Sequence, residues 1–272
     1  MAMIVQHNMK AMNSNRMLNV NTQSLSKTTE KLSSGYKINR AADDAAGLAI
    51  SEKMRRQVRG LTQASANAQD GISMVQTAEG ALNEVHDMLQ RMNELAVKAE
   101  NGTLTTLDRN YVDAEVQQLL TEIDRVADTT TFNELTLLDG SMGEVSLQVG
   151  AESGTYINIS IQAMNVAGLS LTGVSASSQA NAASLNDAVE EAIKTLSTQR
   201  SNLGAIQNRL EHTINNLDNV VENTQSAESR IRDTDMATEM VKYANNNILA
   251  QAGQAMLAQA NQANQGVLSL LQ

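Results

Sequence analysis

Apolar residues recur at steps of three and four along most of this chain, which is the spacing of one face of an α-helix. The strongest early run begins at Gly71 and ends at the stop signal Asn101-Gly102. Its inward positions are Ile72, Val75, Ala78, Leu82, Val85, Leu89, Met92, Ala96 and Ala99. A shorter apolar run covers Ala45–Leu61, and the glycines at 60 and 71 leave open whether the two runs form one helix.

Two further helices are predicted, each beginning at an N-terminal capping pattern. The first follows Thr105 and Asp108, and its apolar positions are Val112, Val116, Leu119, Ile123 and Val126. The second is expected after Ser184, where Asp187 completes a similar pattern. Its inward positions are Val189, Ala192, Leu196, Gln199, Leu203, Ile206, Leu210, Thr213, Leu217, Val220, Thr224, Ala227 and Ile231.

Both ends of the chain also carry helical seams. Near the start, a coiled-coil-like heptad seam that stops at Ser33-Ser34-Gly35 consists of Ile4, Ala11, Leu18, Leu25 and Leu32. The last stretch, Met236–Gln272, has no charge after Lys242, and its one-face positions are Ala237, Val241, Ala244, Ile248, Ala252, Met256, Ala260, Ala263, Val267 and Leu271. An uncharged helix of this kind needs a partner, so we expect it to pair with the N-terminal seam.

The period changes from helical to two in the middle of the chain. Val145, Leu147 and Val149 alternate with polar residues, and the isoleucines at 157, 159 and 161 do the same after a turn. This pattern predicts a β-hairpin near residues 144–161. The following Gly-, Ser- and Ala-rich stretch, residues 167–183, is typical of a loop or linker.

Together these patterns predict a mainly α fold, a long antiparallel helical rod resembling a coiled-coil bundle, with a small β-hairpin and paired N- and C-terminal helices. Composition supports long helices, because the chain has no proline, no cysteine and no tryptophan. Methionine is abundant, with fourteen residues, and filling of helical cores is its natural role.

Charge argues against nucleic acid as a partner. The net charge is −10 at pH 7, while residues 1–60 hold ten Lys and Arg against four Asp and Glu. These basic residues are spaced out and lack interleaved aromatics, so a basic-armed nucleic-acid-binding coiled coil is the weaker alternative. No apolar run reaches membrane-span length, and Met1–Val20 lacks the apolar core of a signal peptide, so we expect neither membrane insertion nor a cleavable signal.

No group of residues has the pattern of an active site. His7, His86 and His212 stand far apart, and none has a second metal ligand at helical spacing. The adjacent carboxylates Asp43-Asp44 and Glu190-Glu191 do not face each other on a helix. We therefore expect no catalytic residues, no metal and no cofactor.

Both ends of the chain closely resemble bacterial flagellin, the filament subunit of the flagellum. The N-terminal resemblance lies in Lys31–Arg40 (KLSSGYKINR), Asp43–Ile50 (DDAAGLAI), Gln69–Ser73 and Gln76–Gly80. The C-terminal resemblance lies in Ser229–Asp235 (SRIRDTD), Ala255–Gln262 (AMLAQANQ) and Val267–Leu271. Only a short segment stands where longer flagellins insert large variable outer domains.

The resemblance implies a structural subunit that polymerises with copies of itself. Residues 1–42 and 235–272 would form the inner tube of a filament, and residues 43–234 the outer tube. It further implies unfolded export through the flagellar type III channel, an export chaperone on the C-terminal helix, and partners at the filament cap and junction, outside the cell. A hook–filament junction protein of the same superfamily is the alternative.

The resemblance also implies contact with the flagellin-sensing Toll-like receptor of animal hosts. The stretch Leu89–Val97 (LQRMNELAV) matches the receptor motif, and Glu115 matches the acidic contact on the next helix. The implied contacts are Gln90, Arg91, Glu94, Leu95 and Glu115.

Overall fold

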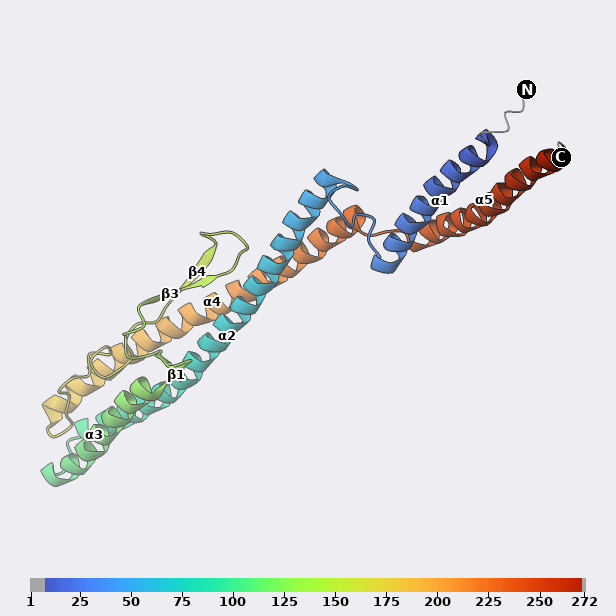
Figure 1. Ribbon diagram of the computed structural model, residues 1–272. Helices are drawn as coiled ribbons and strands as arrows, with labels where there is room; N and C mark the ends of the chain where they lie inside the picture. The colour runs from blue at the N-terminus through green and yellow to red at the C-terminus, as the bar shows by residue number, and fades with distance from the viewer. Residues whose placement is uncertain (1–7, 271–272) are drawn as a thin grey trace. The chain divides into compact units, whose positions relative to one another are not determined.

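The computed structural model describes residues 8–270, with side chains up to residue 263. The chain is mainly helical, as predicted, with two small antiparallel strand pairs (Figure 1). In chain order the elements are α1 (Met9–Ser34), α2 (Ala45–Glu100), α3 (Thr106–Thr129), β1 (Thr131–Phe132), β2 (Leu135–Thr136), β3 (Glu144–Gln148), β4 (Tyr156–Ser160), α4 (Gln179–Arg232) and α5 (Met236–Leu270). None of the described helices combines the length and hydropathy that a membrane-spanning segment needs.

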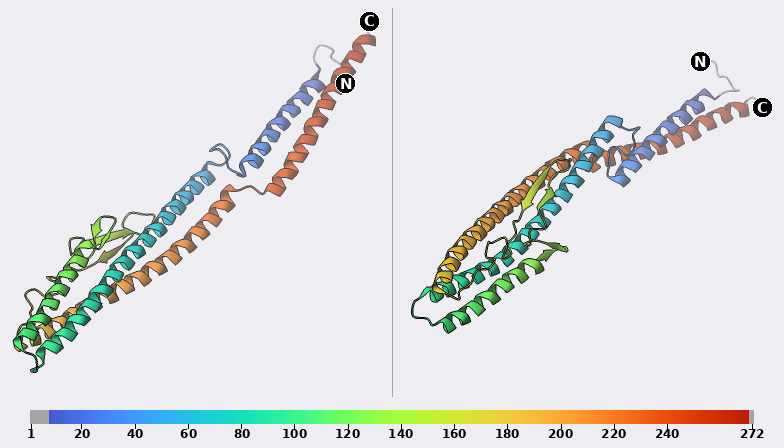
Figure 2. Two further views of the ribbon diagram at one scale, coloured as in Figure 1. Left: turned by 90° about the horizontal axis from the view of Figure 1, so that it is seen from below. Right: turned by 90° about the vertical axis from the view of Figure 1, so that its left-hand side faces the viewer.

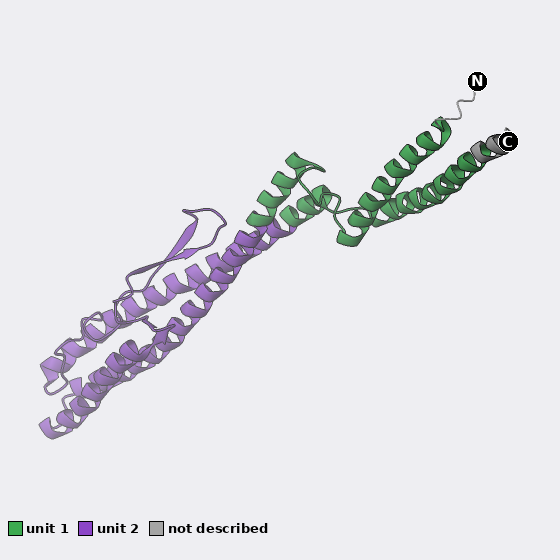
Figure 3. Ribbon diagram, viewed as in Figure 1, with its two compact units in different colours: residues 1–56, 223–272 green, residues 57–222 purple. Residues whose placement is uncertain are grey.

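The chain divides into two compact units (Figure 3). The terminal unit contains the residues up to 56 and from 223 onward, and the central unit contains residues 57–222. Helices α2 and α4 contribute to both units.

In the central unit, α2 runs antiparallel to α3 and to α4 (Figure 2). Polar contacts between α2 and α4 show this direction, because residue numbers rise on one helix as they fall on the other. The pairs are Ser65–Asp218, Glu79–Arg200 and Asn93–Asn186. Between α2 and α3, Arg109 Nε donates to the Ala99 carbonyl at 2.9 Å.

The core of the central unit follows the predicted stripes. Fully buried positions include Leu82, Val85 and Leu89 on α2, Val116 and Ile123 on α3, and Leu196, Leu203 and Leu210 on α4. Gln199 is also buried, as predicted, and its Nε2 donates to the Ser160 carbonyl at 3.1 Å. The prediction for Val220 is wrong, since this side chain is exposed and Val221 packs against Leu217 instead.

The predicted capping box at Thr105 and Asp108 is present, whereas the one at Ser184 and Asp187 is wrong. Helix α4 already begins at Gln179, where the Ser178 Oγ accepts from the Asn181 backbone N–H at 3.2 Å. The Ser184 hydroxyl donates to the Ala180 carbonyl, one turn earlier in the same helix. A serine that bonds back into a helix has the same sequence signature as a cap.

The β3–β4 hairpin has the predicted alternation and packs on α2. Val145 pairs with Ile159 and Leu147 pairs with Ile157, and both isoleucines are buried. Helix α2 is continuous through Gly60 and Gly71, which give the hairpin room. A methyl group at Gly60 would lie 2.8 Å from the Ala151 Cβ, and one at Gly71 would overlap Leu147.

The segment between β4 and α4 is irregular but packed, so it is not a linker. Leu169, Leu171 and Ala176 are buried in it. Polar side chains of α3 fix its backbone: Asp113 accepts from the Ala176 N–H at 2.6 Å, and Asp124 accepts from the Val166 N–H at 2.8 Å. These carboxylates look like ordinary solvated residues in the sequence, and their long-range roles have no local signature.

The short β1–β2 pair is missing from the sequence prediction. Its two-residue turn places Asn133 and Glu134 at positive φ, 50° and 66°. Asparagine tolerates this conformation well, so Asn133 was the one available signal for a tight turn.

Candidate functional site

In the terminal unit, α1 packs along α5 (Figure 1). Residues Ala11, Leu18, Leu25 and Leu32 of the predicted α1 seam are half-buried. The α5 side of the contact is formed by Tyr243, Asn246, Asn247, Ala250, Gly253, Leu257 and Ala260, which are half-buried in turn. The two helices are antiparallel, because Asn8 Nδ2 donates to the Ala260 carbonyl at 3.0 Å and Asn21 Nδ2 donates to the Asn246 carbonyl at 3.4 Å.

The α5 positions predicted to form the seam mostly face away from α1. Val241, Ile248 and Met256 are 61%, 64% and 62% exposed. Ala252 and Ala263 are exposed as well, and only Ala260 is half-buried. Ile4 and Leu271 lie outside the described residues, and the side chain of Val267 lies outside the described side chains.

Close approach of the two backbones explains which α5 face meets α1. A methyl group at Gly253 would lie 3.3 Å from the Leu18 Cδ1, so a small residue suits this position. The amides of the stripe also find partners there, since Asn246 Nδ2 donates to the Ser24 hydroxyl at 3.3 Å. Most of the larger apolar side chains of α5 therefore lie on its free faces, as do three methionines and Val20 of α1. We call these faces the terminal apolar surface, which comprises Met9, Met12, Met17, Val20, Met236, Met240, Val241, Ile248, Leu249 and Met256.

The connectors between α1 and α2 and between α4 and α5 are held together by a cluster around Arg232. Its guanidinium lies 4.8 Å from the centroid of the Tyr36 ring, a cation–π distance. It also pairs with Glu52 at 2.6 Å. Two backbone bonds join the same segments, from the Lys37 N–H to the Arg232 carbonyl at 2.7 Å and from the Thr234 N–H to the Gly35 carbonyl at 3.0 Å. The sequence motifs SSGY and RIRDTD thus meet in space.

The expected receptor contacts lie at one place on α2 and α3. Arg91 donates through Nε to Glu115 and through Nη1 to Glu94, each at 2.9 Å. These bonds, the one to Glu94 first, raise the pKa of Arg91 above its ordinary value. Gln90, Arg91, Glu94 and Glu115 are exposed, and we call them the polar patch.

Leu95 differs from the other expected contacts. It is 2% exposed and belongs to the core of the central unit, so its side chain is not accessible at the surface as a direct contact would require. Leu95 and Arg91 are one turn apart on α2, but the Leu95 side chain is buried in the core whereas the Arg91 side chain is exposed. Exposed apolar residues within one turn of the patch residues are Val97 on α2 and Tyr111 on α3.

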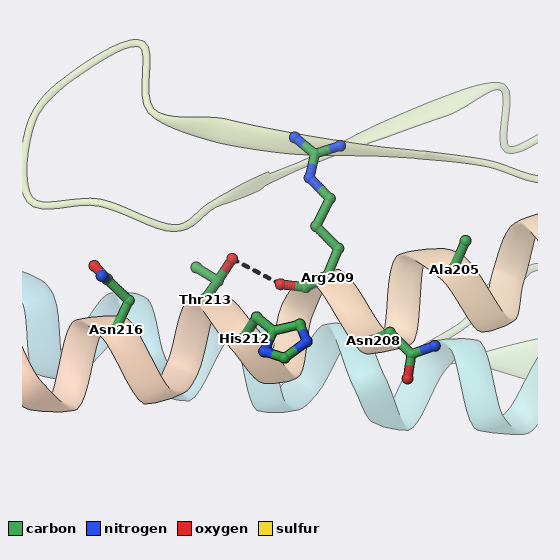
Figure 4. A pocket seen from close by; sticks show the side chains of 6 residues that line it. All are labelled: Ala205, Asn208, Arg209, His212, Thr213 and Asn216. Carbon is green, nitrogen blue, oxygen red and sulfur yellow. Dashed lines mark hydrogen bonds between the residues drawn. The ribbon is translucent and has the colours of Figure 1, made fainter.

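A groove along α4 is lined by residues of this helix alone (Figure 4). Arg209 reaches toward the hairpin ribbon, and the Thr213 hydroxyl donates to the Arg209 carbonyl at 2.8 Å. His212 points to another side, so the polar groups do not converge on one point. Among the described residues, no three His, Asp or Glu side chains come together as a metal site would require.

Two family models match the chain. The bacterial flagellin N-terminal helical region matches residues 5–142, and the bacterial flagellin C-terminal helical region matches residues 186–271. Flagellin of Halalkalibacterium halodurans is 56% identical over 271 residues, covering 99% of this chain and 100% of that protein. The flagellar filament 31.3 kDa core protein of Treponema maltophilum is 47% identical over 286 residues, with the same coverage.

Solved structures agree with the sequence relatives. The crystal structure of Bacillus cereus flagellin has a TM-score of 0.52 at 30% identity, and the match covers 56% of this chain and 88% of that one. A putative flagellar hook-associated protein from Vibrio parahaemolyticus has a TM-score of 0.60 at 14% identity over 70% of this chain and 100% of that one, which indicates a shared fold. The chain therefore belongs to the bacterial flagellin family, a family of structural proteins and not of enzymes.

Proposed function

We propose that this protein is the repeating subunit of a flagellar filament, outside the cell, and that it polymerises with copies of itself. The observation that carries the proposal is the terminal apolar surface, which neither α1 nor α5 covers for the other. Exposed apolar area of this kind is stabilised by burial against a partner. Because different surfaces of successive copies would meet, the assembly continues as an open helix and does not close into a ring.

The proposed division of labour assigns residues 1–42 and 235–272 to an inner tube and residues 43–234 to an outer tube. The seam positions Val241, Ile248 and Met256 would then meet neighbouring copies in the inner tube. Their exposure in the single chain supports this assignment. The uncharged flanks of α5 support it too, since no charged group has to be desolvated there after Lys242.

The proposal includes export of the unfolded chain through the flagellar channel and assembly at the distal tip. An export chaperone would hold the C-terminal helix, and cap and junction proteins would contact the growing end. Refolding after export is helped by the absence of proline and cysteine, because neither slow X-Pro isomerisation nor disulfide formation delays it.

Removal of residues 236–272 tests the assembly proposal. The truncated protein should fail to elongate sheared filament seeds at any concentration at which the full chain elongates them, as seen by electron microscopy. Retained cooperative unfolding of the truncated protein is the control for an intact central unit. Growth of long filaments by the truncated protein would contradict the proposal, and a full chain that binds seeds without elongating them would favour the junction-protein alternative.

We further propose that the polar patch binds the host flagellin-sensing Toll-like receptor. The support is the clustering of Gln90, Arg91, Glu94 and Glu115 on an exposed face, with Arg91 held in place by two carboxylates. An ordered arginine loses little conformational entropy on binding and is a common hot spot of interfaces.

The patch is tested by Arg91→Ala with Arg125→Ala as the matched control. Arg125 is also exposed and pairs with Glu122 three residues away, but it lies outside the patch. We expect Arg91→Ala to weaken binding of the monomer to the receptor ectodomain by at least about tenfold and Arg125→Ala to leave it within about twofold. Equal effects of the two variants on surface-plasmon-resonance affinities would refute the assignment.

A further inference from the structure

The described methionines of this chain differ widely in burial, and core filling does not explain the exposed ones. Met74, Met92 and Met164 of the central unit are at most 4% exposed. By contrast, every methionine that is exposed within the described part of the chain lies on α1 or α5. We call these the terminal methionines: Met9 (66% exposed), Met12 (62%), Met17 (56%), Met236 (47%), Met240 (55%) and Met256 (62%).

Within the described part of the chain, the terminal methionines are the most exposed soft nucleophiles, since the sequence contains no cysteine. With hydrogen peroxide, a thioether sulfur attacks one oxygen of the peroxide. A sulfur–oxygen bond forms, the oxygen–oxygen bond breaks, and the second oxygen leaves as water. The sulfur is oxidised by two electrons to the sulfoxide, and the peroxide is reduced.

We propose that the terminal methionines are a set of oxidation sites whose sulfoxides reversibly block addition of the subunit to a filament. The inference rests on the proposed self-assembly, and the covering partner it assumes is a second copy of this chain. It concerns the same terminal apolar surface, of which these methionines are the largest group.

Oxidation acts on assembly because it changes the surface without changing the fold of the monomer. The terminal methionines lie off the stripe by which α1 and α5 pair, so their sulfoxides remain in water while the subunit is free. When a second copy covers them, each sulfoxide oxygen has to give up its hydrogen bonds to water. The conversion of an apolar group into a strong acceptor therefore weakens the intermolecular contact selectively.

The same geometry makes oxidation depend on the assembly state. In the free subunit the terminal sulfurs are open to peroxide, whereas the buried methionines of the central unit are shielded. In a filament the terminal methionines become covered and should be shielded too. Oxidative damage would then fall on unassembled subunits.

The first measurement maps oxidation. Monomer is treated with hydrogen peroxide in graded amounts, and peptide mass spectrometry counts added oxygen atoms at each methionine. The terminal methionines should react at least about tenfold faster than Met74, Met92 and Met164. Filaments treated in parallel should show slower oxidation at the terminal methionines, and equal rates in monomer and filament would overturn the inference.

The second measurement follows assembly. Peroxide-treated monomer should need an at least about tenfold higher concentration to elongate seeds than untreated monomer, with unchanged far-ultraviolet circular dichroism. Methionine sulfoxide reductases with dithiothreitol should restore elongation, since the dithiol gives two electrons, becomes a disulfide, and the oxygen leaves as water. Undiminished elongation of the oxidised protein would overturn the inference and leave the proposed assembly intact.

Leucine variants assign the effect to these sulfurs. Leucine has a similar volume and cannot be oxidised under these conditions. One variant carries Met9→Leu, Met12→Leu and Met17→Leu, and another carries Met236→Leu, Met240→Leu and Met256→Leu. In each variant, and in their combination, we compare treated with untreated protein. The quantity compared is the monomer concentration needed to elongate seeds. Its ratio between treated and untreated protein should move toward one, and a ratio as large as that of the natural chain would overturn the inference. Failure of the untreated natural chain to elongate seeds would instead contradict the proposed assembly itself, and the inference with it.

Discussion

A single polar residue, Asp235, caps the N-terminus of α5 in the terminal unit. Its Oδ1 accepts from the Ala237 N–H at 3.0 Å and the Thr238 N–H at 3.3 Å, and its Oδ2 accepts from the Thr238 hydroxyl at 2.7 Å. The hydroxyl of Thr238, and then its backbone N–H, lower the pKa of Asp235 below the ordinary value of 3.8. A carboxylate at a helix N-terminus is further favoured by the helix dipole.

Asp235→Ala should reduce the thermal stability of the terminal unit at neutral pH. The folded-state pKa is below the unfolded value, so the cap stabilises above pH 3.8 and this contribution is lost as the pH falls through the folded-state pKa. The difference in thermal unfolding temperature between the natural chain and the variant, followed by circular dichroism, should therefore shrink in acid. Asp235→Asn is the control, because it keeps an acceptor at the cap, and a difference that grows in acid would contradict this account.

Leu95 and Val97 show how burial decides the role of a residue within one motif. Leu95→Ala should lower the free energy of unfolding by about 2 to 5 kcal/mol, since it opens a cavity in a fully packed core. Val97 is 55% exposed, and Val97→Ala should change it by less than about 0.5 kcal/mol. Urea denaturation measures both values, and a small effect of Leu95→Ala would contradict the place of this residue in the packed core.

At the scale of elements, the apolar period predicts the helices well and their partners less well. The stripe of α4 from Val189 to Leu217 faces the core as predicted, with Ile206 and Thr213 half-buried and the other positions buried, because a core face must keep its period along the whole contact. The α5 face is different. Its period fits several faces nearly equally, and the contact with α1 uses Gly253 and asparagines, which a search for large apolar residues passes over.

Alanine substitutions at two glycines of α2 distinguish the effect of helix propensity from the effect of packing. Gly80→Ala should stabilise the protein by about 0.5 to 1 kcal/mol, because nothing lies within 4 Å of the added methyl group and alanine favours the helix. Gly60→Ala gains the same propensity but forces the methyl group against Ala151, an overlap that costs about 1 to 3 kcal/mol. Thermal or urea unfolding should thus rank Gly80→Ala above Gly60→Ala, and the reverse order would show that the hairpin does not pack on α2 in solution.

Much of the polar patch was also predictable, whereas the contact that joins its two helices was not. The motif places Arg91 and Glu94 one turn apart on the same helix, but only the pairing of α2 with α3 brings Glu115 to the same arginine. The cluster around Arg232 was beyond sequence reasoning for the same reason, since Tyr36 and Arg232 meet only through the fold.

At the scale of the whole molecule, stability is unevenly distributed between the two units. The central unit holds nearly all of the fully buried apolar side chains, while α1 has Thr28 as its buried residue and α5 has Glu239. Local opening is easiest where few apolar contacts are lost.

Hydrogen exchange should therefore divide the free subunit along the chain. Backbone amides of α1 and α5 are expected to exchange at least about tenfold faster than those of α2 and α4 in the central unit, as measured by mass spectrometry. Assembly into filaments should slow the terminal amides most. Uniform protection in the free subunit would contradict this picture.

The pairing of α1 with α5 also fixes an order of events. The Asn8–Ala260 bond joins residues that are 252 positions apart, so a chain delivered end to end cannot form it until nearly all of the polypeptide has appeared. The central unit comprises residues 57–222, so it can fold before α5 has appeared. Whichever terminal helix emerges first has no pairing partner until the other has emerged. A subunit truncated at either end would therefore keep α1 or α5 without the helix it packs against.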